Sequence, residues 1–317
     1  MALGEFDLIE RYFTRQGGRG DVLLGVGDDA ALLQVPPGQV LVAAVDTLVE
    51  GRHFLPDAPP ESIGHQALAV NLSDLAAMGA TPAWALLSLS LPEANEAWLS
   101  GFAAGLYALA DRSGVALVGG DTVRGPRVVT ITALGFVEPG QALRRSGARP
   151  GDLVYVSGWP GEAAAGLEAL RRGDALGPDD PLVRRYRFAE PRLALGRDLR
   201  GRATAAMDVS DGLLGDLQKL CASSGVGAQL DLECLPMSKE LTRRHAAGEC
   251  ERLVLSGGDD YELLFTVPAD RAAAIEAELS TRHALRRIGC IEAAPGVRCA
   301  RGGQPTDVQG AGYDHFA

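Results

Sequence analysis

The chain has 317 residues, of which 46% are hydrophobic and 22% charged, and its formal net charge is -11. This size and composition are typical of a globular protein with two domains and exclude a disordered chain. The negative charge argues against binding of nucleic acid or an anionic membrane surface, and no run of 18 apolar residues predicts a transmembrane helix. The five cysteines are widely spaced without a CxxC pair, which favours a reducing, cytoplasmic location over a disulfide or zinc framework.

Hydrophobic periodicity predicts a mixed α/β first half. Phe6, Ile9 and Phe13 recur at helical spacing near the amino terminus. Short runs rich in β-branched residues predict strands at Val40–Val45, Ala83–Leu91, Val115–Val118 and Val128–Val137. Two longer patterns predict helices over Ser62–Met78 and Asn95–Ser113, the second ending at Gly114, a typical helix stop.

The segment from Arg144 to Asp152 concentrates Gly, Pro and charge, as an inter-domain turn does. We therefore expect an N-terminal domain over residues 1–140 and a C-terminal domain over residues 150–317. The second half is predicted to be α/β as well, with strands at Leu153–Ser157, Ala203–Met207, Ala228–Leu232, Tyr261–Val267 and Arg286–Ile291. Helices are predicted at Glu162–Arg171, Leu213–Ser223 and Ala269–Ser280, and a surface loop at Gly173–Pro181.

Aspartates follow several of the strand-like runs, which is a pattern of position and not of composition. They are Asp28, Asp29, Asp46, Asp121 and Asp208. Each one alone fits a turn former or a helix N-cap. Ligands bind at the carboxyl ends of strands in open α/β sheets, so together these carboxylates predict one cleft. Because like charges at close range repel, such a cleft needs a cation, and oxygen ligands beside a phosphate indicate Mg²⁺.

Two further patterns support a site for metal and phosphate. Asn71 and Asp74 share one helix face in strongly apolar surroundings, which favours a ligand role over an ordinary solvated stripe. Gly119-Gly120 and Gly257-Gly258 lie beside aspartates and would let backbone N–H groups approach phosphate oxygens, although a Gly-Gly pair is also a plain tight turn.

The familiar nucleotide motifs do not account for this pattern. Gly25-x-Gly27-x-x-Ala30 matches a relaxed dinucleotide fingerprint, but Asp28 and Asp29 stand where the pyrophosphate would meet the helix. The chain has no P-loop, HExxH, GxSxG or protein-kinase set. No nucleophile–base constellation is evident, so no catalytic residue is predicted.

Taken together, the motifs resemble the thiamine-monophosphate kinase family along the whole chain. They include Gly27-Asp28-Asp29-Ala30, Val45-Asp46-Thr47, His53-Phe54, Ala69 to Gly79, Gly119-Gly120-Asp121-Thr122, Asp208 to Leu213, Ser256 to Leu263 and Gly312-Tyr313-Asp314. Several of these strings are shared with aminoimidazole ribonucleotide synthetase, selenophosphate synthetase and a hydrogenase maturation protein.

The resemblance implies an α/β (α+β) two-domain fold like that of aminoimidazole ribonucleotide synthetase, with mixed sheets flanked by helices and N-terminal sheets that pair in a homodimer. It implies several Mg²⁺ ions, with ATP and thiamine monophosphate as substrates. The metal ligands would be Asp29, Asp46, Asp74, Asp121, Asp208 and Asp211. ATP would contact Gly120, Asp121, Arg145 and Ser210, and thiamine monophosphate would contact His53, Asp259 and Tyr313.

Two positions depart from the family pattern. Ala44 and Val45 stand where a hydroxyl-bearing pair is common, so any metal contact there would come from backbone carbonyls. Asp259 stands where a glutamate is common, which shortens the reach of the carboxylate by one methylene.

The acceptor implied by the resemblance is a phosphate monoester, which is largely deprotonated at neutral pH and requires no general base. We therefore expect direct in-line phosphoryl transfer, with catalysis by positioning and charge neutralisation. The alternatives are another ATP-dependent enzyme of the superfamily, a metal-dependent phosphatase, and a non-catalytic carrier of thiamine phosphate or nucleotide.

Overall fold

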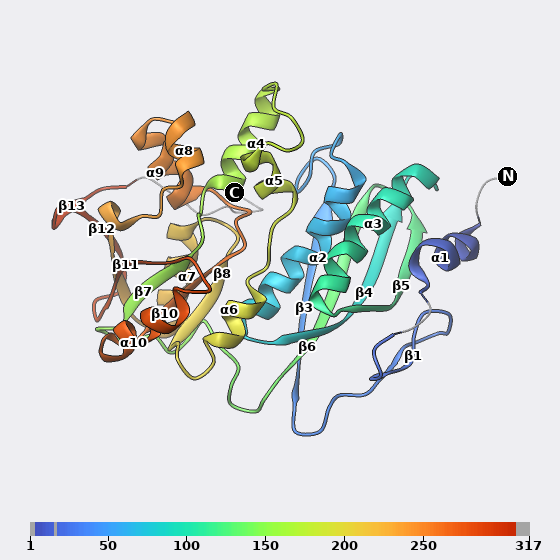
Figure 1. Cartoon of the computed structure of the whole chain (residues 1–317), viewed down its shortest axis with the longest axis horizontal. Coiled ribbons are helices and arrows are strands. Elements are labelled where there is room, and N and C mark those ends of the chain that lie inside the picture. Colours follow the sequence, from blue (N-terminus) through green and yellow to red (C-terminus); the bar gives the residue numbers. More distant parts are fainter. Residues whose placement is uncertain (1–3, 16–17, 309–317) are drawn as a thin grey trace. The chain divides into compact units, whose positions relative to one another are not determined.

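The computed structural model describes residues 4–15 and 18–308. The chain divides into two compact units, the first formed by Met1–Leu75 with Ala80–Gly140 and the second by Ala76–Gly79 with Gln141–Ala317. Each unit has its own sheet, so the two are described separately (Figure 1).

The first unit is built on a four-stranded sheet in the order β3-β6-β4-β5, in which β4 and β5 are parallel and the other neighbours antiparallel. A separate pair, β1 and β2, is antiparallel. The described elements of this unit are α1 (Glu5–Phe13), β1 (Val22–Leu24), β2 (Leu32–Leu33), β3 (Val40–Val49), α2 (Pro60–Ala77), β4 (Thr81–Leu91), α3 (Glu96–Ser113), β5 (Ala116–Arg124) and β6 (Val128–Val137).

Helices α2 and α3 run side by side along the four-stranded sheet (Figure 1). Two glycines permit their close approach, because a Cβ at Gly64 would lie 2.0 Å from the carbonyl oxygen of Phe102 and one at Gly105 would lie 1.8 Å from that of Glu61. The Asn95 side chain accepts the Trp98 amide at the start of α3, and Gly114 ends the helix in the left-handed conformation. Apolar side chains of both helices are buried, including Leu68, Leu72 and Phe102.

The two faces of this sheet differ in burial. Along β3, the side chains of Leu41, Ala43, Val45 and Thr47 are exposed, whereas the alternate residues from Val42 to Leu48 are at least partly buried. Strands β1 and β2 contribute Val22 and Leu33 to a small core around Trp84, Val118 and Phe136. Apolar side chains such as Val45, which is 61% exposed, therefore lie on an open sheet face.

The second unit is built on a seven-stranded sheet in the order β13-β12-β9-β11-β7-β10-β8, antiparallel except for the pair β9 and β12. Its described elements are β7 (Leu153–Ser157), α4 (Glu162–Arg172), α5 (Pro181–Arg187), α6 (Leu193–Asp198), β8 (Ala205–Val209), α7 (Leu213–Ser224), β9 (Gly227–Asp231), η1 (Leu232–Cys234), α8 (Lys239–Arg244), α9 (Ala247–Ser256), β10 (Glu262–Val267), α10 (Ala269–Leu279), β11 (Leu285–Glu292), β12 (Gly296–Arg301) and β13 (Gln304–Thr306).

The central strands of the second unit are buried on both faces. Val154 and Val156 of β7 belong to a core with α7 and α9, whereas Tyr155 between them belongs to a second core with α10. Successive side chains of a strand point to opposite faces, so the sheet separates two apolar layers. This explains why β7, β8 and β10 read as nearly continuous apolar runs in the sequence.

Three aspartates that were predicted to follow strands lie within strands instead. Asp46, Asp121 and Asp208 lie inside β3, β5 and β8, where they pair with Ile131, Ser88 and Leu263. Neighbouring strands continue the backbone ladder past each aspartate, which overrides its low intrinsic preference for strands. In the first unit, Asp46 and Asp121 lie on β3 and β5, which are the opposite edge strands of the four-stranded sheet.

Candidate functional site

Three predicted site residues lie close together along the chain: Asp208 in β8, and Ser210 and Asp211 in the turn between β8 and α7. Asp208 is 4% exposed. Asp216, fully buried in α7, accepts hydrogen bonds from the amides of Ser210 and Asp211 at 3.0 and 3.1 Å. Lys219 Nζ donates to Asp211 at 2.6 Å and to Asp216 at 2.9 Å. Helix α7 therefore fixes this turn, and Asp211 already has a cationic partner.

A second turn, between α9 and β10, contains Asp259. The backbones of Asp259 and Tyr261 are left-handed, with φ of 63° and 52°. The amide of Asp259 donates to the carbonyl of Ser210 at 2.9 Å, and that of Tyr261 donates to the carbonyl of Val209 at 2.8 Å. A Cβ at Gly258 would lie 2.6 Å from the Ser210 carbonyl oxygen, so the close approach of the two turns requires glycine there. The structure thus joins Asp259 to the turn that carries Ser210 and Asp211.

The acidic groups of these two turns have perturbed pKa values. Burial raises the pKa of Asp259 to about 6, and the nearby Asp211 charge adds to this, while the Tyr261 hydroxyl and Arg171 oppose it. Burial also raises the pKa of Asp216 against the effect of Lys219. For Lys219, burial would lower the pKa, but hydrogen bonds to both aspartates outweigh it, so the pKa is raised. The Lys219 ammonium therefore stays charged beside Asp211 at neutral pH.

In the first unit, Asp29 and Asp121 line one pocket with a volume of about 730 Å³. Asp28 and Asp29 come from the loop between β1 and β2, while the segment from Gly119 to Thr122 comes from β5. The pocket also has an apolar wall, to which α1 contributes Phe6, Ile9 and Phe13. The pocket therefore combines carboxylates and glycine backbone with an apolar wall, a mixture of polar and apolar groups that is common in ligand pockets.

Gly120 is the position in this pocket where a side chain is excluded. Its φ is 148°, and a Cβ would lie 1.7 Å from the carbonyl oxygen of Leu87 in β4. Gly120 is also exposed, so the backbone of β5 next to Asp121 is accessible without an intervening side chain.

The remaining predicted residues of β3 lie on the other edge of the sheet. Asp46 lies in one register row with Ile131, Leu87 and Gly120, so it is about three strand spacings, or roughly 14 Å, from the last of these. Consecutive carbonyls alternate in direction on an edge strand, so one of the Ala44 and Val45 carbonyls points away from β6.

His53 follows β3 in a tight turn, where its Nδ1 accepts the amide of Val49 at 3.0 Å. A neutral ring in this arrangement carries its proton on Nε2.

Asp74 lies on α2, one turn after Asn71, and is partly exposed. Asn71 is fully buried, and its Nδ2 donates to the Ala67 carbonyl at 3.0 Å. Its Oδ1 is buried without a hydrogen-bond partner among the atoms that the structure describes. An unsatisfied buried amide oxygen beside a carboxylate is a place where a cation or water fits.

Two further residues were predicted for the site, Arg145 and Tyr313. Arg145 is exposed, and its carbonyl accepts the Ser224 hydroxyl at 3.0 Å. Tyr313 lies outside the described residues. Within residues 4–15 and 18–308, no three His, Cys, Asp or Glu side chains lie close enough to hold one metal ion. The predicted ligands thus form two local groups, Asp29 with Asp121 and Asp208 with Asp211, while Asp46 and Asp74 lie apart on β3 and α2.

Sequence reasoning missed several residues that support the site. Asp216 and Lys219 lie three residues apart on α7, so a pair of opposite charges in a helix with no other charged residue was the available signal. Asp260 and Glu262 are fully buried, and acidic residues beside the apolar run from Leu263 to Val267 could have indicated paired internal charges.

Two family models match this chain, one in each half of the sequence. Residues 27–137 match the N-terminal domain model of AIR synthase related proteins, and residues 149–300 match the C-terminal domain model. A thiamine-monophosphate kinase from Salmonella typhimurium is 46% identical over 323 residues, covering 100% of this chain and 99% of the relative.

Two solved structures agree with this. The thiamine-monophosphate kinase of Stenotrophomonas maltophilia K279a superposes with a TM-score of 0.88 at 46% identity, covering 96% of this chain and 99% of the other. AaThiL complexed with AMPPCP and TMP superposes with a TM-score of 0.78 at 33% identity, covering 89% of each chain. In addition, no helix within the described part of the chain is long and apolar enough to cross a membrane.

Proposed function

The chain belongs to the thiamine-monophosphate kinase family, and from that membership we propose that it transfers the terminal phosphate of ATP to thiamine monophosphate, yielding thiamine diphosphate. The observation that carries the proposal is the likeness over the whole chain to relatives of that name, together with AaThiL, whose structure holds AMPPCP and TMP. Each unit also contains acidic residues beside glycines, at Gly119 to Asp121 in the first unit and at Gly257 to Asp259 in the second.

Mg²⁺ is the cation that fits these residues. The proposed ligands Asp29, Asp46, Asp74, Asp121, Asp208 and Asp211 offer oxygen donors, and the unpartnered Oδ1 of Asn71 beside Asp74 is a further oxygen. One carbonyl of Ala44 or Val45 on the edge strand β3 could add a backbone ligand. Several bound Mg²⁺ ions would neutralise the charge of two anions that otherwise repel each other.

We assign the nucleotide to Gly120, Asp121, Ser210 and Arg145. The bare backbone at Gly120 lets phosphate oxygens approach β5, and the apolar wall of the first-unit pocket provides a place for the base. Arg145 is exposed, so its guanidinium is accessible to a phosphate.

We assign thiamine monophosphate to His53, Asp259 and Tyr313. The neutral tautomer of His53 presents an Nε2–H donor, which suits a phosphate oxygen. The carboxylate of Asp259 suits a cationic ring when ionised, which its raised pKa of about 6 permits at neutral pH. In this scheme the N-terminal domain, residues 1–140, holds metal and ATP, and the C-terminal domain, residues 150–317, completes the substrate site.

The chain's own contribution to catalysis is positioning. The acceptor phosphate is already ionised near neutral pH, so no side chain has to remove a proton before direct in-line attack on ATP. A phosphorylated protein formed from labelled ATP in the absence of acceptor would contradict direct transfer.

A homodimer and a cytoplasmic location complete the proposal. The exposed apolar side chains of Leu41 and Val45 on the open sheet face suit pairing with a second copy. All five cysteines are free thiols, as expected in a reducing compartment.

The test is an assay of purified protein with ATP, Mg²⁺ and thiamine monophosphate, with products separated by chromatography. Controls omit ATP, omit metal, or replace thiamine monophosphate by thiamine. Thiamine diphosphate formed in the complete mixture alone supports the kinase. Phosphate released without ATP would instead indicate a phosphatase, and binding without turnover would indicate a carrier.

A further inference from the structure

The turn that presents Asp259 is held in an unfavourable backbone conformation. Asp259 and Tyr261 both have positive φ, and neither is glycine. Residues other than glycine enter this region at a cost, and such a conformation persists where the surroundings impose it. Two buried acidic residues hold the turn in this conformation: Asp260 lies between the two left-handed residues, and Glu262 follows them.

Asp260 ties the turn to helix α4. Its carboxylate is fully buried and accepts the Gly161 amide with both oxygens, at 2.9 and 2.8 Å. Gly161 is the N-cap of α4, an 11-residue helix, so the carboxylate lies at the positive end of the helix dipole. Asp260 thereby fixes the backbone between the two left-handed residues.

Glu262 ties the other end of the turn to a buried ion cluster. Its carboxylate, 0% exposed, accepts Arg185 at 2.5 Å, Arg192 at 2.5 and 2.6 Å, and the Ser157 hydroxyl at 2.5 Å. Arg185 also donates to the carbonyl of Asp260 at 2.6 Å. Burial alone would raise the pKa of Glu262, but Arg185, Arg192 and Ser157 outweigh it and lower the pKa. We call Ser157, Arg185, Arg192 and Glu262 the Glu262 cluster.

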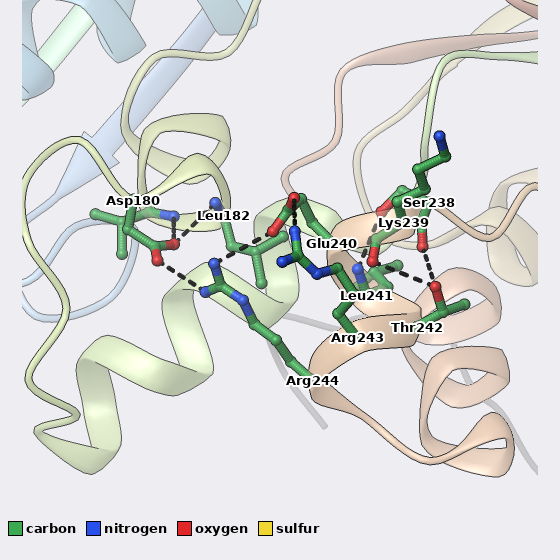
Figure 2. A network of polar contacts seen from close by, with 10 residues as sticks. Asp180, Leu182, Ser238, Lys239, Glu240, Leu241, Thr242, Arg243 and Arg244 are labelled. Atoms are coloured by element: carbon green, nitrogen blue, oxygen red, sulfur yellow. Dashed lines mark hydrogen bonds and ion pairs between the residues drawn. The ribbon is translucent and has the colours of Figure 1, made fainter.

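Helix α5, which carries Arg185, is itself fixed at its start. Asp180 accepts the Leu182 amide at 3.0 Å as the N-cap of α5. Figure 2 shows Arg244 of α8 pairing with Asp180, at 2.8 Å, and with Glu240, at 3.3 Å. Arg185 thus contacts Asp260 and Glu262 from a helix whose N-cap is tied to α8.

A contribution to stability alone does not account for the Glu262 cluster. Desolvation offsets most of the attraction in buried ion pairs, so well-packed apolar residues would stabilise the fold as well. What such a cluster provides is one defined geometry, here for the backbone that leads to Asp259.

We propose that the Glu262 cluster and Asp260 are positioning residues that set the Asp259 carboxylate and Tyr261 in place for the phosphate acceptor. This rests on the proposed function, in which Asp259 contacts thiamine monophosphate. Arg192 is the best position at which to test the proposal, because its side chain is 33% exposed. When the Arg192 side chain is removed, Glu262 keeps its ion pair with Arg185 and is not left as an unpaired buried charge.

The experiment compares Arg192→Ala, Arg192→Lys and Asp259→Asn with wild type. Steady-state assays are expected to give a KM for thiamine monophosphate raised about tenfold or more in Arg192→Ala and in Asp259→Asn, with the KM for ATP within about twofold of wild type. Arg192→Lys is expected to recover part of the loss, because it keeps the charge but not the two-pronged contact. Arg252→Ala is the matched control, since Arg252 bridges Glu168 and Glu249 at 2.7 Å in the same unit without touching the turn.

Hydrogen exchange of the free protein supplies a second readout that needs no substrate. In Arg192→Ala, exchange is expected to speed up in peptides that contain Asp259 and Tyr261 and to stay unchanged in β12 and β13; Arg252→Ala leaves the turn unchanged. An effect of Asp259→Asn without any effect of Arg192→Ala overturns the inference and leaves the proposed function standing. The inference is also overturned if Arg192→Ala raises the KM values for ATP and thiamine monophosphate equally and speeds up exchange in all peptides. If wild type makes no thiamine diphosphate, the proposed function alone is overturned. The exchange measurement then still decides whether Arg192 positions the turn.

Discussion

Lys219 Nζ lies 2.6 Å from the carboxylate of Asp211, a residue that we assign to metal binding. The same ammonium is 2.9 Å from the fully buried Asp216. A cation that approaches Asp211 therefore competes with a charge that the protein already supplies, while Asp216 keeps Lys219 nearby.

Replacing Lys219→Gln is expected to tighten Mg²⁺ binding about three- to fivefold, because Asp211 loses a competing ion pair that is partly exposed. Calorimetric titration of the protein with Mg²⁺ measures the change. Lys239→Gln removes the same charge at the start of α8 and is expected to leave Mg²⁺ affinity unchanged. Equal affinities for wild type and Lys219→Gln would show that Asp211 does not bind the ion.

Replacing Asp216→Ala is expected to lower the free energy of unfolding by about 2–4 kcal/mol. The partly buried amides of Ser210 and Asp211 lose their shared acceptor, and leaving a buried amide unpaired costs about 1–3 kcal/mol. Urea denaturation measures the difference. Asp174→Ala is the control, because Asp174 pairs with Arg172 at the surface and its loss is expected to change stability by less than about 1 kcal/mol.

The raised pKa of Asp259 makes stability depend on pH in a defined direction. Between its ordinary pKa of 3.8 and about 6, the folded protein retains a proton that the unfolded chain releases, so the free energy of unfolding falls as pH rises. Above about pH 6, Asp259 is ionised in both the folded and the unfolded protein, and the free-energy cost of burying its charge no longer changes with pH. Asp259→Asn removes the penalty and is expected to gain up to about 3 kcal/mol over wild type as pH rises from about 4 to 7.

Denaturation of the metal-free protein in EDTA across this pH range measures that gain. Asp179→Asn, at a carboxylate that is 92% exposed, controls for the change in net charge and is expected to show no such trend. A difference between Asp259→Asn and wild type that stays the same from about pH 4 to 7 would contradict a raised pKa.

Gly120→Ala is expected to lower the free energy of unfolding by at least about 2 kcal/mol and to raise the KM for ATP about tenfold. The new Cβ would meet the Leu87 carbonyl oxygen at 1.7 Å, and alanine is strained at a φ of 148°. Denaturation and ATP-dependence of the assay measure the two effects. At Gly20 a Cβ would meet no described atom within 4 Å, so Gly20→Ala should match wild type in both.

Much of the fold could be predicted from the sequence, because its central strands and longer helices have strong periodicity. The helices α2, α3 and α7 and the strands β4, β6 and β7 lie close to their predicted ranges. Helix α5 was missed although Asp180-Pro181 is a typical helix start, because its seven residues are too short to show a period.

The site was harder to predict than the fold. The association of Ser210 with Asp259 depends on two turns that meet through backbone hydrogen bonds, and no sequence spacing reveals such a contact. The predicted ends of β3 and β5 were wrong, because backbone pairing with β6 and β4 continues each strand past its apolar run to include Asp46 and Asp121. The ion pairs of Glu262 with Arg185 and Arg192 hold the turn that contains Asp259, and they join residues of separate elements. Only tertiary packing brings these residues together, so the sequence alone does not reveal the pairs.

The most direct test of the central claim is the fate of the terminal phosphate of ATP labelled with ³²P. Purified wild-type protein is mixed with labelled ATP, Mg²⁺ and thiamine monophosphate, and the products of a single turnover are separated. The account predicts that the label appears in thiamine diphosphate, with no labelled protein when thiamine monophosphate is omitted. Label recovered as inorganic phosphate, with no thiamine diphosphate formed, would contradict it.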